Sequence, residues 1–362
     1  MEPLKLHDLH QRWGAHFARV AGAEFVDDYG DPRAELAGLQ EGAAILDLSF
    51  RSRLCLTGAD RVRFLHGQVT NDVNRLALGE GCYAALITAK GRMQSDLYIY
   101  RLEEELLLDF EPGLAPAVRE RLDKYVIADD VQVVDVAAHY GLLSLQGPQA
   151  ESVLKSLALA VEVPAKAFNF VKITDENLGE IYLVNQPRLG TLGFDLFVPT
   201  AAMEAVAAKM LAAAPSGVRF CGWQALETAR LEVGIPRFGA DMDDTTIPLE
   251  AGLESRAISF SKGCYIGQEV ISRIHTYGQV AKALRRLRLA DNLPALPARG
   301  DKLYHQNKEA GYLTSAARSP RLSANPALGY VRKEADQPGA ELTVRTTQGE
   351  SAVRIEGPPY GV

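Results

Sequence analysis

The sequence predicts an α+β protein that ends in a small antiparallel β-barrel. Residues 82–110 form three apolar runs separated by turn residues, which is typical of an antiparallel meander. From residue 282 onward, short strand-like runs recur at even spacing, which is typical of a small closed barrel. Elsewhere apolar residues recur at helical spacing, so helices and strands are expected to share the larger part of the chain.

Before residue 282 both helices and strands are expected. Residues 235–262 have weak periodicity and are expected to be mainly loop. Helices are expected over 5–20, 114–125, 200–213 and 223–233, with one capped by Asp60 that runs through Phe64 and Leu65 and one more just after Cys264. Strands are expected over 43–48, 53–57, 83–88, 93–102, 106–110, 131–136, 141–146, 181–185 and 193–198. The barrel strands are expected over 283–289, 302–305, 310–318, 327–333, 342–346 and 352–355.

Composition and charge exclude several classes of protein. The chain has 362 residues and a net charge of −7, which argues against a general nucleic-acid binder, so no direct nucleic-acid contact is expected. The N-terminus lacks a continuous apolar run, and no stretch is long and apolar enough to span a membrane. The four cysteines show no C-x-x-C pair and no nearby histidine at zinc-ligand spacing, so we expect reduced thiols, no metal site and a cytoplasmic protein.

The sharpest local motif is the segment KGCYIGQEV, which runs from Lys262 to Val270. Glycine precedes Cys264 and a cation lies two residues before it. If a helix starts just after Cys264, its terminal N–H groups and Lys262 would both favour a thiolate. The alternative is a structural cysteine, which is the commoner role of a free thiol.

Three polar residues lie where either a ligand site or an ordinary structural role would fit. Asp96 follows a strand turn and can hold a flat, nitrogen-rich ring or act as an acid or base, although surface turns often carry aspartate. Asp195 lies in an apolar strand and either faces solvent by alternation or accepts hydrogen bonds from a ligand. Arg230, late in a helix, either complements the helix dipole or binds a ligand carboxylate. The turn after Gln68 reads as structural.

The order of several short motifs resembles that of the glycine-cleavage T-protein superfamily over most of the chain, and KGCYIGQEV looks like the signature of its YgfZ branch. T-protein enzymes have no cysteine at this position. The motifs are Thr57-Gly58, Phe64-Leu65, Thr70-Asn71-Asp72-Val73, Gly91-Arg92-Met93 to Asp96, Leu145-Gln146-Gly147-Pro148 and Arg230-Leu231-Glu232.

The resemblance implies an organisation and a ligand. It implies a folate-binding portion over residues 1–281, made of two subdomains (1–140 with 221–281, and 141–220). A C-terminal barrel over 282–362 would complete a central channel. The implied ligand is tetrahydrofolate or a one-carbon derivative.

The resemblance also carries site residues onto this chain. Tyr83 and Asp96 fall on the folate-contacting strand and turn of the family. Asp109 lies where T-proteins usually have asparagine, Asp195 falls on their pterin-binding glutamate, and Arg230 falls on the arginine of their R-L-E-A-G segment.

Three functions remain open. The first is a tetrahydrofolate-binding accessory protein that supports iron–sulfur cluster assembly or repair and, through it, tRNA-modifying enzymes. Its partners would be iron–sulfur assembly machinery or client enzymes, and Cys264, Lys262 and Asp96 would carry its chemistry. The second is a tetrahydrofolate-dependent aminomethyl- or methyltransferase or demethylase. Because Ser95 replaces one of the paired acids of T-proteins, aminomethyl transfer is expected to be weak or absent. The third is a scaffold in which Cys264 is structural.

Overall fold

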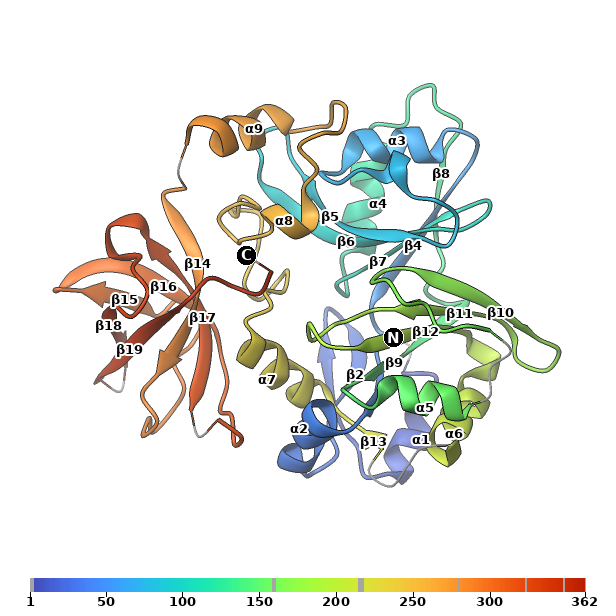
Figure 1. Ribbon diagram of the computed structural model, residues 1–362, viewed down its shortest axis with the longest axis horizontal. Helices are drawn as coiled ribbons and strands as arrows, with labels where there is room; N and C mark the ends of the chain where they lie inside the picture. The colour runs from blue at the N-terminus through green and yellow to red at the C-terminus, as the bar shows by residue number, and fades with distance from the viewer. Residues whose placement is uncertain are drawn as a thin grey trace. The chain divides into compact units, whose positions relative to one another are not determined.

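The protein has a mixed α+β fold that ends in a closed barrel of β-strands (Figure 1). The computed structural model describes residues 3–157, 161–213, 218–278, 280–322, 324–347 and 349–361. Within these ranges no helix combines the length and the apolar character that crossing a bilayer requires.

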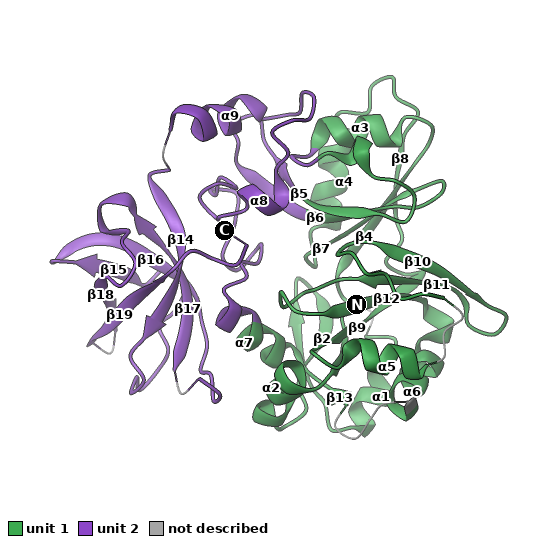
Figure 2. Cartoon of the chain, viewed as in Figure 1, with its two compact units in different colours: residues 1–68, 72–83, 97–229 green, residues 69–71, 84–96, 230–362 purple. Residues whose placement is uncertain are grey.

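The chain forms two compact units (Figure 2). Unit 1 comprises residues 1–68, 72–83 and 97–229, and unit 2 comprises residues 69–71, 84–96 and 230–362. The division passes through strands β5 (Gly81–Ile87) and β6 (Met93–Arg101) and through helix α7 (Trp223–Val233). Unit 2 is therefore more than the barrel, because it also takes the tip of the β5–β6 hairpin and residues 230–281.

Unit 1 contains a six-stranded sheet in the order β10-β11-β12-β9-β3-β13. Strands β11 and β12 confirm the strands predicted over 181–185 and 193–198, and they pair antiparallel. The register places Asp195 of β12 opposite Ser144 of β9, which sets two polar side chains together inside an apolar sheet. The strands are β3 (Ala44–Asp47), β9 (Tyr140–Gln146), β10 (Phe170–Asp175), β11 (Gly179–Asn185), β12 (Gly193–Pro199) and β13 (Arg219–Phe220).

A five-stranded sheet has the order β5-β6-β7-β4-β8 and contains the meander predicted over 82–110. Asp109 of β7 pairs with Tyr98 of β6 on one side and with Arg53 of β4 on the other. Opposed residues in antiparallel strands project to the same face, so these three side chains share one face of the sheet. The remaining strands are β4 (Ser52–Thr57), β7 (Leu106–Phe110) and β8 (Gln132–Asp135).

Six C-terminal strands close into an antiparallel barrel in the order β14-β17-β16-β15-β18-β19, which confirms the predicted barrel. Pairing of β14 with β19 closes it. Its interior is apolar and includes Leu303 and Val344, both fully buried. The strands are β14 (Lys282–Leu289), β15 (Lys302–His305), β16 (Lys308–Ala316), β17 (Asn325–Arg332), β18 (Glu341–Thr346) and β19 (Gly349–Gly357).

The long helix predicted over residues 5–20 is wrong in its second half. Helix α1 ends at Arg12, Gly14 adopts a φ of +77°, and His16–Val20 forms strand β1, which pairs with β2 (Ala23–Asp28). A left-handed glycine ends a helix readily, and the strand partner then takes the backbone hydrogen bonds.

The other predicted helices are present. The helices α2, α5 and α8 and the strands β2, β10 and β13 were not predicted from the sequence. The 3-10 turns are Val73–Arg75, Thr200–Ala202 and Lys333–Ala335. The α-helices besides α7 are α1 (His7–Arg12), α2 (Pro32–Glu41), α3 (Arg61–Gln68), α4 (Ala115–Asp123), α5 (Ala150–Ser156), α6 (Met203–Ala213), α8 (Glu254–Ala257) and α9 (Gln268–Tyr277).

Candidate functional site

Two carboxylates of unit 1, Asp109 and Asp195, are completely buried. Asp109 lies on the five-stranded sheet and Asp195 on the six-stranded sheet. The solvent-facing alternative for Asp195 is therefore wrong. Burying an ionised carboxylate is costly unless cations and hydrogen bonds compensate it, so the partners of these two groups define the site.

Arg51 compensates Asp109. Its Nε lies 3.0 Å from both carboxylate oxygens of Asp109, and its Nη1 donates to Oε1 of Glu111 at 2.6 Å. Burial alone would raise the pKa of the Asp109 carboxyl, but Arg51 and Arg188 outweigh it and hold that pKa below its ordinary value.

Arg188 compensates Asp195 and joins the two sheets within unit 1. This arginine lies in the loop between β11 and β12, and its Nε donates to both carboxylate oxygens of Asp195 at 3.1 Å. Its Nη2 donates to Oδ2 of Asp195 and also to Oδ2 of Asp109, the latter at 3.2 Å. We call Arg51, Asp109, Glu111, Arg188 and Asp195 the carboxylate–arginine cluster.

Asp195 also accepts a hydrogen bond from Ser144 Oγ at 2.7 Å. Gln146 Nε2 donates to Ser144 Oγ at 2.9 Å, so this hydroxyl is oriented toward the carboxylate. Burial raises the pKa of the Asp195 carboxyl, while Arg188 and Ser144 oppose the rise. The carboxylate therefore meets a complete set of donors from the chain itself.

Aromatic rings border the cluster. The Arg188 guanidinium carbon lies 5.6 Å from the centre of the Tyr98 ring, within the range of a cation–π contact. Tyr98 in turn lies against Tyr83 and Phe168, with ring centres 5.0 Å and 5.8 Å away. Tyr83 is thus a buried neighbour of the cluster through Tyr98. The three rings are tilted against one another, by 37° and 40°, and form an aromatic cluster beside the paired hydrogen-bonding groups.

The predicted ligand residues divide between the two units. Tyr83, Asp109 and Asp195 lie in unit 1, whereas Asp96 and Arg230 lie in unit 2. Asp96 is buried on β6, and Ser95 Oγ donates to its carbonyl oxygen at 3.0 Å.

Arg230 is buried and bound by the protein itself. Its Nη1 donates to Oδ2 of Asp241 at 2.7 Å and to the Ile235 carbonyl at 3.0 Å. Its Nη2 lies 3.3 Å from Ser315 Oγ of strand β16. Within unit 2 the side chain therefore ties the end of α7 to the barrel, a role that neither sequence interpretation included.

The turn around Cys264 is anchored by Lys262. The buried ammonium of Lys262 donates to the carbonyl oxygens of Val69 and Asn71 at 2.7 and 2.8 Å, and it lies 4.9 Å from the centre of the Tyr265 ring. Cys264 is exposed, whereas Cys55 and Cys221 are buried and all four cysteines are free thiols. The turn therefore presents the sulfur of Cys264 to solvent on an anchored backbone.

The helix after Cys264 begins later than the sequence suggested. Helix α9 starts at Gln268, with Gly267 as its N-cap in the left-handed conformation at a φ of +85°. A helix dipole acts mainly within its first turn, so the expected thiolate stabilisation by the helix start loses its main support. A Cβ at Gly267 would lie 2.5 Å from the Thr88 carbonyl oxygen, so glycine lets this turn pack closely on the β5–β6 hairpin tip in unit 2.

The turn after Gln68 is structural, as predicted. Thr70 Oγ1 donates to the Ala257 carbonyl at 2.6 Å and accepts from the Ala85 amide at 2.9 Å. The Asp72 side chain accepts from the Arg75 amide and caps the short helical turn there.

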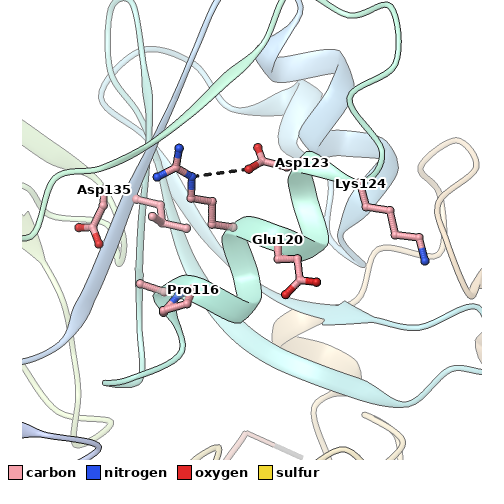
Figure 3. Close-up of a pocket in the computed structure, with 8 residues that line it drawn as sticks. Pro116, Glu120, Asp123, Lys124 and Asp135 are labelled. Atoms are coloured by element: carbon pink, nitrogen blue, oxygen red, sulfur yellow. Dashed lines mark ion pairs between the residues drawn. The ribbon is translucent and has the colours of Figure 1, made fainter.

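A surface hollow of about 650 Å³ lies over helix α4 in unit 1 (Figure 3). Its charged lining comes mostly from α4, where Arg119 and Asp123 form an exposed ion pair at 3.5 Å. The hollow is lined by Leu54, Ala115, Pro116, Arg119, Glu120, Asp123, Lys124 and Asp135. It contains no predicted site residue, so it does not compete with the cluster as the candidate site.

Two family models cover nearly the whole chain. The GCVT N-terminal domain matches residues 6–262, and the glycine cleavage T-protein C-terminal barrel domain matches residues 282–360. The chain belongs to the glycine cleavage T-protein family. The expected superfamily is thereby confirmed.

Relatives of this T-protein-family chain are similar over nearly all of this chain. An aminomethyltransferase from Halalkalibacterium halodurans is 27% identical over 98% of this chain and 96% of its own. A putative chloroplastic transferase from Arabidopsis thaliana is 27% identical over 93% of this chain and 76% of its own. The crystal structure of aminomethyltransferase T from Bartonella henselae has a TM-score of 0.89 at 24% identity, covers 98% of this chain and 97% of its own, and shows the same fold.

The candidate site also contains residues that sequence reasoning missed. Arg51, Arg188, Glu111 and Ser144 surround the two predicted aspartates, yet none was assigned a role. Arg188 does lie in the same motif as Asp195. An arginine seven residues before an acidic residue in an apolar hairpin is a sequence signal for a buried ion pair such as Arg188–Asp195.

Proposed function

We propose that the chain binds tetrahydrofolate or a one-carbon derivative and transfers a one-carbon unit, as an aminomethyl- or methyltransferase or demethylase. The observation that carries this proposal is the buried Asp195 carboxylate, whose oxygens accept from two neighbouring N–H groups, Nε and Nη2, of one planar guanidinium. A pterin ring offers an N–H and an amino group side by side, which is the same donor pattern.

Two further observations support the proposal. The Tyr98 ring lies next to Arg188 of the carboxylate–arginine cluster and is backed by the buried Tyr83, and flat heterocycles bind favourably against such rings. The relative from Halalkalibacterium halodurans, similar along 98% of this chain, is named an aminomethyltransferase. Asp96 is the proposed acid–base residue of the transfer, and Asp109 and Arg230 remain proposed folate-binding residues.

The binding part is tested by titrating tetrahydrofolate into the wild type and into Asp195→Asn by calorimetry. Loss of a charged hydrogen-bond partner is expected to cost about 1.5–3 kcal/mol, or roughly one to two decades in affinity. Asp47→Asn is a matched control, because Asp47 is another buried unit 1 aspartate, paired with His10. Equal affinities would remove Asp195 from the site, and no binding to wild type would refute folate binding.

The transfer part is tested by measuring methylene-tetrahydrofolate formation from candidate methylamine donors. Aminomethyl transfer from the glycine-cleavage intermediate is expected to be weak, because Ser95 stands in place of one acid. Turnover of about 1–10³ per second with that donor would contradict the expectation of weak activity while supporting the transferase. Asp96→Asn is expected to abolish transfer and to leave folate binding measurable.

A second candidate is a folate-binding accessory protein of the YgfZ type in the cytoplasm, acting on iron–sulfur assembly machinery or client enzymes, tRNA-modifying enzymes among them. The exposed Cys264 on its anchored turn favours it, because a thiol in that position is open to a partner. Cells carrying Cys264→Ala as the sole copy would then lose iron–sulfur enzyme activity. Full activity with a stably folded variant would exclude this candidate.

A further inference from the structure

The Asp195 carboxylate is already occupied by a side chain of the protein. Arg188 donates from Nε and Nη2, and Ser144 donates from its hydroxyl. A carboxylate has about four acceptor positions, so a second bidentate donor has no room beside this set. Any ring that presents two parallel N–H groups to Asp195 must first displace Arg188.

The arginine and the ring edge are chemically equivalent toward the carboxylate. A guanidinium is a planar N–C–N unit with parallel N–H donors. The 2-amino-4-oxopyrimidine edge of a pterin is likewise a planar N–C–N unit with an N–H beside an amino group. Both satisfy the two oxygens of one carboxylate in the same plane.

Arg188 has a second carboxylate partner to retain when it moves. Its Nη2 lies 3.2 Å from Oδ2 of Asp109, which is itself held by Arg51. The Arg188 side chain is only 8% exposed and both carboxylates are completely buried, so releasing it into the protein without a partner would be costly. Asp109 offers that partner within the same cluster.

We infer that Arg188 is an internal, displaceable occupant of the ligand position at Asp195, and that it lowers the affinity for folate by competing with the pterin edge. On binding, the ring takes the Asp195 oxygens and Arg188 keeps its bond to Asp109. The inference rests on the proposed function, because it assumes that a pterin reaches Asp195. It makes Arg188 the residue that sets affinity and selects ligands able to replace a guanidinium.

The test is a double-mutant cycle read by calorimetric titration with 5-formyltetrahydrofolate, a stable reduced folate. Arg188→Met removes the competing donors. Binding is expected to tighten about tenfold or more, because the ligand no longer has to displace a guanidinium from Asp195. The same change in an Asp195→Asn background is expected to leave affinity within about twofold. Thermal melts are expected to show a lower stability for Arg188→Met, opposite in direction to its affinity.

A second variant covers the case in which Arg188→Met does not fold. Arg188→Lys keeps the charge near both aspartates but lacks the planar fork, so it is expected to fold and to bind folate more tightly than wild type. If wild type binds folate and the folded variants bind it equally or more weakly, the inference is overturned and the proposed function still stands. Absence of binding to wild type would instead overturn the proposed function.

Discussion

At the residue scale, Asp109 shows how a buried carboxylate can stabilise the fold. Its folded-state pKa is depressed because Arg51 and Arg188 outweigh the effect of burial. The stabilisation is therefore present above the unfolded-state pKa of about 3.9 and is lost as the pH falls through the folded-state pKa. Asp195 acts in the opposite direction, because burial raises its pKa and its protonation on acidification favours the folded state.

The depressed pKa of Asp109 predicts how the stability of the protein changes as the pH falls. The free energy of unfolding is expected to fall below about pH 4, by about 1.4 kcal/mol for each unit by which the pKa of Asp109 is depressed. Asp109→Asn should be less stable at pH 7 and lose less stability on acidification. Urea unfolding between pH 7 and pH 3 measures both effects. The exposed Asp123→Asn on α4 is the control, and an unchanged slope in Asp109→Asn would contradict the assignment.

A second residue-scale prediction concerns the thiols. Cys264 is exposed, whereas burial raises the pKa of the Cys55 and Cys221 thiols and keeps them protonated. Limiting iodoacetamide at neutral pH is expected to alkylate Cys264 first, with the half-buried Cys82 behind it, as read by peptide mass mapping. If Cys264 labels no faster than Cys55, the reactive-thiol hypothesis fails.

Cys264→Ser supplies the stability control for the thiol hypothesis. An exposed substitution of this size is expected to change the free energy of unfolding by less than about 0.5 kcal/mol. Any functional loss in Cys264→Ser would then report on the thiol rather than on the fold.

At the element scale, the start of helix α9 depends on glycine. Gly267 and Gly239 both adopt a φ of +85°, but a Cβ meets the Thr88 carbonyl only at Gly267 and nothing within 4 Å at Gly239. Gly239→Ala is expected to cost about 1 kcal/mol for its backbone conformation alone. Gly267→Ala is expected to cost a further 1–3 kcal/mol, roughly, from overpacking. Urea unfolding of the two variants measures how much free energy of unfolding each substitution removes. Equal losses for Gly239→Ala and Gly267→Ala would contradict close packing at Gly267.

At the scale of the whole molecule, the closed barrel carries its own apolar interior. We predict that residues 282–362 expressed alone unfold cooperatively on heating, followed by circular dichroism. The fragment lacks Leu231, which packs with Leu284 and Leu328 in the intact chain, so its stability should be lower than that of the barrel in place.

Leu303→Ala within that fragment is the test of its core. Leu303 is fully buried, so truncation is expected to cost about 2–5 kcal/mol, enough to unfold a domain of this size. A broad, non-cooperative melt of the unmodified fragment would show that the barrel needs the rest of unit 2.

The sequence by itself determined the meander, the barrel and the family. Apolar runs broken by turn residues predicted the meander and the barrel, because strand alternation and turn chemistry are short-range properties. Motif order led to the T-protein superfamily without any contact being known. The helix predicted over residues 5–20 was wrong in its second half, because helical spacing in a short amphipathic stretch does not exclude a strand. His16–Val20 forms such a strand and pairs with β2.

Tertiary structure alone decided the partners of the polar residues. Nothing in the sequence pairs Arg51 with Asp109, Arg230 with Asp241, or Lys262 with the carbonyls of the turn after Gln68. These contacts join segments that lie apart along the chain, and the high cost of burying an uncompensated charge selects them during folding. Arg188 is the clearest case. The sequence identified its motif, but only the approach of two sheets brings its guanidinium onto both Asp195 and Asp109.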